Sequence, residues 1–315
     1  MKIVMLEAAT VSRNDVSFDD IYALGEVTEY PLTPDDKIVE YIGDAQAVLC
    51  NKTLLTAEVL EKCPELEYIG ECATGFNNID IEAAKRLGIT VCNVPAYSDV
   101  AVAQQVFSFI LHFASRVADY NRFVSEKGWI NSPSFAPIEF PTIELAGKTL
   151  GIIGFGRIGK TVAGIASAFG MKVIVNTRTV RNEEGVEFVS FEELMKRSDF
   201  ITLHCPLTPE TNGLVDMNAL KLCKPSAVLI NTSRGPVVNE HDLAKALENG
   251  IIAGAGLDVL STEPMAADCP LFGAENCVIT PHVAWAPRET RVRLMKTVAD
   301  NLAAYISGKP VNKVN

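Results

Sequence analysis

A glycine-rich turn near the middle of the chain constrains its fold more than any other feature. Gly154, Gly156 and Gly159 have the spacing GxGxxG. An apolar run predicts a strand just before the turn, and apolar residues at helical spacing predict a helix just after it. In such a turn, backbone N–H groups approach a pyrophosphate, and the helix N-terminus contributes partial positive charge. The turn therefore predicts a dinucleotide-binding fold, and its mid-chain position requires another folded unit before it.

Length, charge and cysteine spacing limit the number of domains and the kinds of molecule that the protein is expected to bind. With 315 residues, 48% of them hydrophobic and 21% charged, the chain is long enough for two domains. A net charge of -11 without a basic run disfavours nucleic-acid and anionic-membrane partners. No signal peptide or membrane span is predicted, so we expect a cytoplasmic protein. The eight cysteines show no CxxC pair and no Cys/His spacing, which predicts buried thiols and no metal site.

The first hundred residues alternate predicted strands and helices, as in a small α/β unit. The strands are predicted at 2–6, 27–30, 45–49, 68–70 and 90–92, with helices at 56–60 and 81–87. An apolar stripe at helical spacing predicts one long helix from 99 to about 127. Three prolines between 132 and 141 predict an extended segment, whose aromatic residues suit an oligomer contact.

After residue 148 the alternation becomes regular, which predicts a doubly wound parallel sheet. The strands are predicted at 149–153, 172–176, 199–204, 227–231, 252–258 and 277–280, and the helices at 157–169, 191–197, 216–222 and 240–249. Ser190 and Glu193 form a predicted capping box. A last helix over 287–306 is expected to return to the first unit. We therefore expect a substrate domain, 1–98 plus 288–315, and a dinucleotide-binding domain, 99–287.

The residues after the second strand of the dinucleotide-binding domain bear on the choice of cofactor. An acidic residue normally stands there and holds the ribose 2′-OH of NAD. This chain has Thr177, Arg178 and Thr179 instead. Arginine pairs bidentately with phosphate, so we predict NAD(P) with a preference for NADP. In the alternative interpretation, Arg178 stacks on adenine or lies in solvent while NAD still binds.

Several further motifs resemble the D-isomer-specific 2-hydroxyacid dehydrogenase family over essentially the whole chain. They are Cys72–Asn77, Leu203–Thr211, Ile230–Gly235, Leu257–Pro264 and Thr280–His282. The resemblance implies two doubly wound α/β domains, a Rossmann NAD(P)-binding domain inserted in a flavodoxin-like substrate domain. It also implies hydride transfer between NAD(P) and a small D-2-hydroxy acid or 2-oxo acid, and a homodimer.

Oxidation of a 2-hydroxy acid needs a base for the hydroxyl proton and a cation for the substrate oxygens. Histidine is the natural base near neutral pH, and the candidates are His112, His204, His241 and His282. By resemblance the base is His282, its carboxylate partner is Glu263, and the cation is Arg234. In the alternative interpretation, Glu263 is an exposed turn residue and Arg234 an ordinary surface cation.

The resemblance also assigns binding residues. The backbone of Ala73, Thr74 and Gly75 is expected to bind the substrate carboxylate together with Arg234 and His282. Arg157 and Ile158 are expected at the pyrophosphate. Thr232 is expected near the ribose of the nicotinamide, and Asp258 near the nicotinamide amide. The remaining residues implied at the cofactor are His204, Cys205, Pro206, Thr211, Ser233, Arg234 and His282.

Within the family, the chain most resembles the glycerate dehydrogenase and hydroxypyruvate reductase group, which implies D-glycerate/hydroxypyruvate or glyoxylate as substrates. The segments that carry this likeness are 73–77, 102–104 and 281–285. A dehydrogenase for another D-2-hydroxy acid is an alternative. Gln104 departs from the commoner pattern, which has Glu there. One alternative is a nucleotide-sensing binding protein of the corepressor type, which keeps the same residues. Another is a formate dehydrogenase, which pairs its histidine with an amide rather than with a carboxylate such as Glu263.

Overall fold

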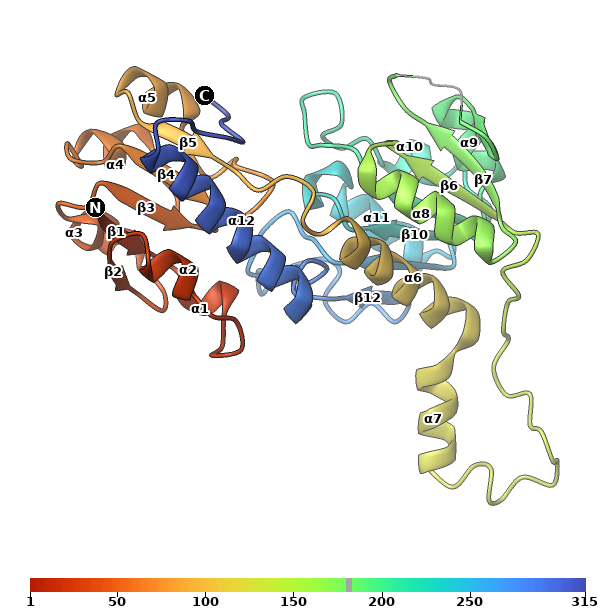
Figure 1. Cartoon of the computed structure of the whole chain (residues 1–315). Helices are drawn as coiled ribbons and strands as arrows, with labels where there is room; N and C mark the ends of the chain where they lie inside the picture. The colour runs from red at the N-terminus through yellow and green to blue at the C-terminus, as the bar shows by residue number, and fades with distance from the viewer. Residues whose placement is uncertain (180–182) are drawn as a thin grey trace. The chain divides into compact units, whose positions relative to one another are not determined.

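The structure, a computed structural model, describes residues 1–179 and 183–315 and divides the chain into two compact units. The first unit contains residues 1–98 and 285–315, and the second contains residues 99–284. The second unit is thus inserted in the sequence of the first (Figure 1).

The first unit is built on a parallel five-stranded sheet with the strand order β2-β1-β3-β4-β5. Buried clusters cover its two faces, and the last helix, α12, contributes Leu294, Val298 and Leu302 to one of them. The C-terminal helix therefore returns to the first unit, as predicted. The elements are β1 (Lys2–Met5), α1 (Ala8–Val11), α2 (Asp19–Tyr22), β2 (Glu26–Glu29), η1 (Asp35–Lys37), α3 (Ile38–Ile42), β3 (Ala47–Cys50), α4 (Ala57–Glu61), β4 (Tyr68–Glu71), α5 (Ile81–Arg86), β5 (Thr90–Cys92) and α12 (Arg288–Ile306).

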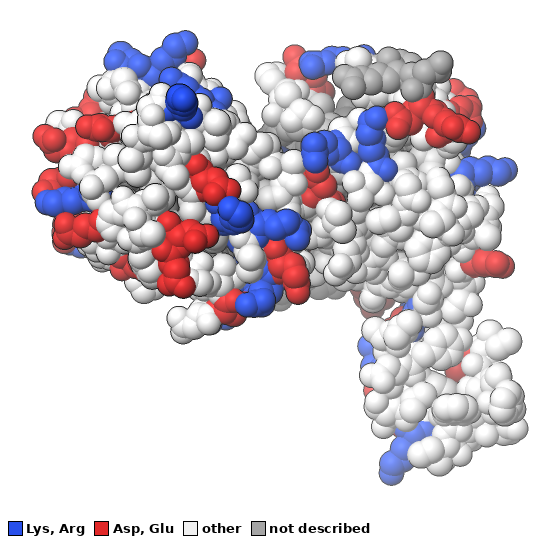
Figure 2. Space-filling model, in the orientation of Figure 1, with Lys and Arg blue, Asp and Glu red and all other residues white. Residues whose placement is uncertain are grey.

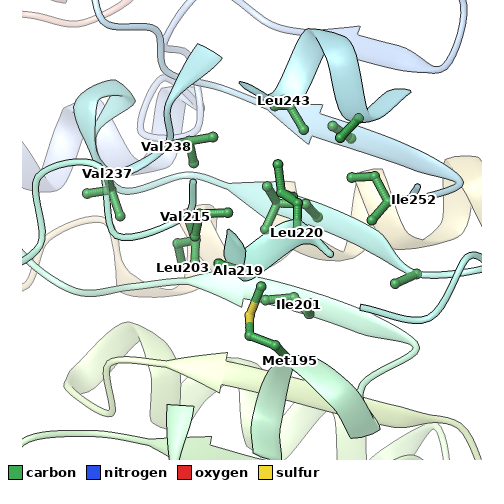
Figure 3. Packing of buried hydrophobic residues seen from close by; sticks show 14 of the residues in the cluster. Met195, Ile201, Leu203, Val215, Ala219, Leu220, Val237, Val238, Leu243 and Ile252 are labelled. Carbon is green, nitrogen blue, oxygen red and sulfur yellow. The ribbon is translucent and has the colours of Figure 1, made fainter. Parts of the chain in front are cut away.

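The second unit is built on a parallel seven-stranded sheet with the order β12-β11-β10-β9-β6-β7-β8. One face packs against α6 and α8. The other face packs against α9, α10 and α11, and Figure 3 shows buried side chains of this second cluster. The elements are α6 (Asp99–Ser115), α7 (Val117–Ser125), β6 (Thr149–Ile153), α8 (Arg157–Ala168), β7 (Lys172–Asn176), β8 (Val186–Phe188), α9 (Phe191–Arg197), β9 (Phe200–Leu203), α10 (Met217–Leu220), β10 (Val228–Asn231), η2 (Gly235–Val237), α11 (Glu240–Glu248), β11 (Gly254–Leu257) and β12 (Cys277–Ile279).

Local sequence signals explain many helix ends. The side chains of Thr56, Asp80, Asp216 and Asn239 each accept a hydrogen bond from a backbone N–H in the first turn of the helix that follows. Ser190 caps α9 in the same way, but the Glu193 carboxylate pairs with Arg197 across the helix surface. The capping box predicted there is therefore half formed.

The predicted long helix from 99 to 127 is wrong as a single element. The structure has two helices, α6 and α7, bent by 54°. Arg116, between them, has a left-handed φ of 52°, which ends the first helix because a continuing helix needs a negative φ. The periodicity of the apolar residues predicted helix on both sides of Arg116, but it carries no information about a bend in the helix axis.

The second helix, α7, and the loop that follows it form a segment that leaves the body of the second unit, which we call the arm (residues 117–144; Figure 1). Residues 126–148 form neither helix nor strand. Among the described residues, no single helix has the length and apolar composition to cross a membrane, although α6 and α7 pass that test as a bent pair.

Candidate active site

The predicted cofactor residues gather at one edge of the second unit's sheet. Because all seven strands are parallel, their carboxyl ends share that edge. Strand order reverses between β6 and β9, and ligands of doubly wound sheets bind at such a point. The residues that directly follow the strands are Gly154 after β6, Thr177 after β7, His204 after β9, Thr232 after β10, Asp258 after β11 and Thr280 after β12.

The three glycines of the central turn have different roles. Gly154 has a φ of +92°, and a Cβ there would lie 2.6 Å from the backbone of His204 and Cys205. A Cβ on Gly159 would lie 2.5 Å from Gly154 O, so this glycine allows α8 to pack closely on the turn. A Cβ on Gly156 would meet nothing within 4 Å. The turn thus leaves open space at Gly156, where a phosphate group can approach the backbone.

The start of α8 also suits an anion. Gly156 is its N-cap, and no side chain there accepts a hydrogen bond from the first turn. Uncapped N–H groups and the helix dipole favour a negative group at this end. Arg157 lies beside it, exposed and paired with Asp99 at 2.7 Å. These features fit a dinucleotide pyrophosphate.

A second feature fits the same cofactor. Thr232 Oγ1, just after β10, is buried and finds no hydrogen-bond partner in the part of the chain that the structure describes. A buried hydroxyl without a partner is unfavourable, and the ribose hydroxyls of a dinucleotide supply partners. The residues at this edge therefore fit NAD(P).

After β7 the chain presents no acidic residue at the position that holds a ribose in NAD enzymes. Thr177 is half-buried, and Arg178 and Thr179 are exposed. The Thr208 hydroxyl, a backbone N–H group and the charge of Arg178 lower the pKa of Glu210. Arg178 therefore lies within electrostatic reach of the loop after β9.

The loop after β9 contains four predicted cofactor residues. Burial lowers the pKa of His204 to about 3, and its Nε2 lies 2.9 Å from Thr202 Oγ1. His204 is therefore neutral at physiological pH and unsuited to accept a proton. Thr211 closes the loop, because its hydroxyl donates to Pro206 O at 2.6 Å and accepts from Thr208 N at 2.8 Å. Burial raises the pKa of the Cys205 thiol, which keeps it protonated.

Arg234 lies in a loop shaped by its neighbours. The amide of Asn231 donates to Arg234 O at 2.8 Å and accepts from the Ser233 backbone and hydroxyl. A Cβ on Gly235 would lie 1.9 Å from Leu260 C, so this glycine lets the loop pack against the segment that leads to Glu263. Asn231 and Gly235 are positioning residues to which the sequence motif itself assigned no role.

Glu263 and His282 form a hydrogen-bonded pair. His282 Nδ1 lies 2.7 Å from Glu263 Oε2, and Leu260 N donates to Glu263 Oε1 at 3.0 Å. His282 has a left-handed φ of 53°, which its backbone hydrogen bond to Asp258 O helps to maintain. With Nδ1 bound to the carboxylate, the other ring nitrogen, Nε2, is the one available to a reacting oxygen.

Asp258 holds the loop that carries His282. Its buried carboxylate accepts hydrogen bonds from Thr280 Oγ1 at 2.5 Å, Val283 N at 2.9 Å and Ala284 N at 2.8 Å. Burial raises the pKa of Asp258 in spite of these bonds. Gln105, from α6, extends the network to Thr280 at 3.3 Å. Thr280 belongs to one of the motifs that carry the family resemblance, but the sequence indicated neither its contact with Asp258 nor the role of Gln105.

The other two histidines take no part in this edge of the sheet. His112 lies near the end of α6, where its ring meets Phe113 edge-on. His241 is exposed in the first turn of α11.

The predicted carboxylate loop, Ala73–Gly75, belongs to the first unit and follows β4. Val94 N donates to Ala73 O at 2.9 Å, Asn93 Nδ2 donates to Thr74 O at 2.7 Å, and Thr74 Oγ1 donates to Val94 O at 2.7 Å. Within the described residues, the N–H groups of this loop meet no acceptor. N–H groups without an acceptor in the protein are available to a small anion such as a carboxylate.

Comparison with known proteins places the chain in a family. The model of the D-isomer specific 2-hydroxyacid dehydrogenase NAD binding domain matches residues 107–284. A hydroxypyruvate reductase of Blautia hydrogenotrophica is 43% identical, with all of both chains covered. A glyoxylate reductase of Thermococcus litoralis is 44% identical over 90% of this chain and 87% of the relative. These enzyme names do not favour a nucleotide-sensing binding protein.

A solved structure agrees with the fold. The TT0316 protein from Thermus thermophilus superimposes with a TM-score of 0.90 at 33% identity, and the match covers 100% of both chains. The chain is therefore a member of the D-isomer specific 2-hydroxyacid dehydrogenase family and an NAD(P)-dependent oxidoreductase of 2-hydroxy acids.

Proposed function

We propose that the protein reduces hydroxypyruvate and glyoxylate, or oxidises D-glycerate in the reverse direction. The observation that carries this proposal is the His282–Glu263 pair, held at 2.7 Å beside the edge where the dinucleotide residues gather. The likeness to a hydroxypyruvate reductase over the full chain supports this substrate class. Both substrates are small 2-oxo acids, each with a carboxylate and an adjacent carbonyl.

His282 supplies the proton in this proposal. When bound, NAD(P)H supplies the hydride for C2 of the oxo acid. The carbonyl oxygen then takes a proton from His282 Nε2, which gives the hydroxy acid and leaves a neutral imidazole. Glu263 holds Nδ1–H and stabilises the imidazolium before transfer. In oxidation the same atoms move in reverse.

Two further groups bind the substrate in this proposal. Arg234 polarises the carbonyl and attracts the carboxylate, because a guanidinium forms strong charge-assisted hydrogen bonds with such oxygens. The free N–H groups of Ala73, Thr74 and Gly75 bind the carboxylate. The first unit thereby acts as the substrate domain, and the second holds the cofactor.

We also propose that NADP is the preferred cofactor. The half-buried Thr177, the exposed Arg178 and the exposed Thr179 offer hydroxyl and guanidinium groups for a 2′-phosphate. An acidic residue at the same place would repel that phosphate.

A homodimer is proposed as the working assembly, with the arm as its contact. Four large apolar side chains of the arm are highly exposed: Ile130 (78%), Phe135 (93%), Ile138 (87%) and Val117 (69%). On the face shown in Figure 2, this projecting segment is largely uncharged. Exposed apolar surface of this kind is stabilised when a partner covers it, and a second copy offers the matching surface.

The cytoplasm is the proposed location. All eight cysteines are free thiols, as expected where glutathione and thioredoxin keep thiols reduced. Cell fractionation followed by immunoblotting tests this placement, and recovery of the protein in an oxidising compartment would contradict it.

The substrate proposal is tested by steady-state kinetics with a panel of 2-oxo acids. Hydroxypyruvate, glyoxylate, pyruvate and 2-oxoglutarate are each offered with NADPH and with NADH. We expect the highest kcat/KM for hydroxypyruvate or glyoxylate with NADPH. A higher kcat/KM for pyruvate or 2-oxoglutarate would overturn the substrate assignment, and a clear preference for NADH would overturn the cofactor assignment.

A further inference from the structure

Residues 307–315, which follow α12 and are called the C-terminal tail here, form hydrogen bonds with the edge strand of the first unit's sheet. Strand β5 is an edge strand, and the tail lies along it (Figure 1). Asn93 N donates to Asn312 O at 3.2 Å, and Val314 N donates to Val91 O at 2.9 Å. The Asn315 side chain accepts from Val91 N at 3.0 Å. The tail therefore satisfies backbone groups that an edge strand would otherwise leave unpaired.

Three asparagine side chains connect this tail to the loop Ala73–Gly75. Asn312 Nδ2 donates to Asn301 Oδ1 at 2.8 Å, Asn301 Nδ2 donates to Asn93 O at 2.9 Å, and Asn93 Nδ2 donates to Thr74 O at 2.7 Å. Asn301, on α12, is 1% exposed, and Asn93 is 9% exposed. Buried amides of this kind are held in one orientation by the bonds that they make.

Because each peptide group is planar, the hydrogen bonds accepted by the loop carbonyls also fix the directions of the loop N–H groups. In a trans peptide, the carbonyl of one residue and the N–H of the next share a plane and point in opposite directions. The bond from Asn93 to Thr74 O therefore sets the direction of Gly75 N–H. The bond from Val94 N to Ala73 O sets the direction of Thr74 N–H in the same way.

We propose that Asn93, Asn301 and Asn312 are positioning residues that hold the loop N–H groups toward the substrate carboxylate. The C-terminal tail then contributes to the substrate site through these hydrogen bonds. This inference rests on the proposed function, because it requires the loop to bind the carboxylate of a 2-oxo acid. Asn312 suits its place for a second reason, since its φ of 54° is one that asparagine tolerates.

Two substitutions test the proposal. Asn312→Gly retains the left-handed backbone and removes the side chain that orients Asn301. Asn93→Asp keeps the shape of the side chain but removes the donor to Thr74 O. We expect Asn312→Gly to raise KM for hydroxypyruvate about 3- to 10-fold, the worth of one hydrogen bond, and Asn93→Asp to raise it more. The loop binds ground state and transition state alike, so kcat should change less than about twofold.

The matched control is Lys313→Ala, which changes an exposed side chain of the same tail and leaves the asparagine bonds in place. Its KM for hydroxypyruvate should equal that of the wild type. In both asparagine variants, KM for NADPH should also stay unchanged, which a general loss of structure would not allow.

The outcomes separate the inference from the function on which it rests. A wild-type protein that reduces no 2-oxo acid contradicts the proposed function. An active wild type whose KM for hydroxypyruvate is unchanged in Asn312→Gly contradicts the positioning role, whether or not Asn93→Asp folds. A parallel rise of KM for NADPH and for hydroxypyruvate also contradicts it.

Discussion

Glu71, at the end of β4, is a fully buried carboxyl group in the first unit. Asn78 Nδ2 and Cys50 Sγ lie 3.1 Å and 3.2 Å from its Oε2, and its Oε1 meets no partner among the described residues. Burial raises the pKa of Glu71 from 4.5 to about 8, against the smaller opposing effects of Asn78 and Cys50. Glu71 is therefore predominantly protonated at neutral pH, and it lies two residues before Ala73 in the chain.

This burial makes stability depend on pH. Between about pH 4.5 and pH 8 the folded chain keeps the Glu71 proton and the unfolded chain loses it, so the contribution of Glu71 to stability is most favourable below this window and declines as pH rises through it. The slope approaches about 1.4 kcal/mol per pH unit. When the free energy of unfolding is measured with denaturant from pH 5 to pH 8, it should decline less steeply for Glu71→Gln than for the wild type, because glutamine does not titrate. Parallel profiles for the variant and the wild type would contradict the assignment.

We propose that Arg178 determines the cofactor preference. Arg178→Ala removes the charge proposed for the 2′-phosphate, so kcat/KM for NADPH should fall about 10- to 100-fold, the range of a charge-assisted hydrogen bond. The value for NADH should change little. Steady-state kinetics measures both. Lys172→Ala, which removes an exposed cation from the other end of β7, is the control. Equal losses with the two cofactors would show that Arg178 does not recognise the phosphate.

At the scale of residues, the sequence allowed prediction of groups that belong to local motifs. Glu263 and His282 lie within two such motifs, and the structure joins them. The bonds of Asn93 with Asn301 and of Glu71 with Asn78 had no comparable signal. Asn93 and Asn301 are 208 positions apart, and their contact depends on how α12 packs in the first unit. A buried polar contact of this kind becomes visible when the fold is known.

Among the elements, the turn from β6 into α8 offers the sharpest contrast between glycines. A Cβ on Gly159 would lie 2.5 Å from Gly154 O, so Gly159→Ala should push the helix from the turn and weaken NADPH binding. Gly164, in the same helix, has open space around its Cβ position. Gly164→Ala should keep cofactor affinity and stabilise the protein by about 0.5–1 kcal/mol. Titration of NADPH by fluorescence and thermal unfolding test the pair. Equal NADPH affinity in both variants would refute the close-packing role.

Prediction of the elements was most successful where a repeated pattern had a physical cause. The regular alternation after residue 148 gave the strands and helices of the second unit to within one or two residues at most ends. The short strand β8 and the short helices α1, α2 and α3 were missed, because three to five residues carry little periodicity. The break at Arg116 was missed because it depends on one backbone angle.

For the whole molecule, the chain forms two units with separate hydrophobic cores. Both are doubly wound parallel sheets, and their strand orders differ. The mid-chain position of the glycine turn predicted that a unit precedes the cofactor fold. The roles of the units, one for substrate and one for cofactor, remain predictions that the kinetic experiments test.

We expect the dimer to depend on the exposed apolar side chains of the arm. The double variant Phe135→Ser, Ile138→Ser should convert the dimer to a monomer, because it makes the two most exposed apolar residues of the arm polar. Light scattering after size-exclusion chromatography measures the mass. Phe272→Ser, at an apolar side chain that is 74% exposed outside the arm, should leave the dimer intact. A monomeric wild type, or a double variant that stays dimeric, would refute the proposed contact.

We propose that His282, oriented by Glu263, exchanges the proton with the substrate oxygen. The most direct measurement is kcat for hydroxypyruvate reduction by His282→Ala at saturating NADPH, together with the NADPH affinity of the same variant. We expect kcat to fall about 10²- to 10⁴-fold, the usual contribution of general acid–base catalysis, while NADPH still binds. A kcat within a few-fold of the wild type would contradict it.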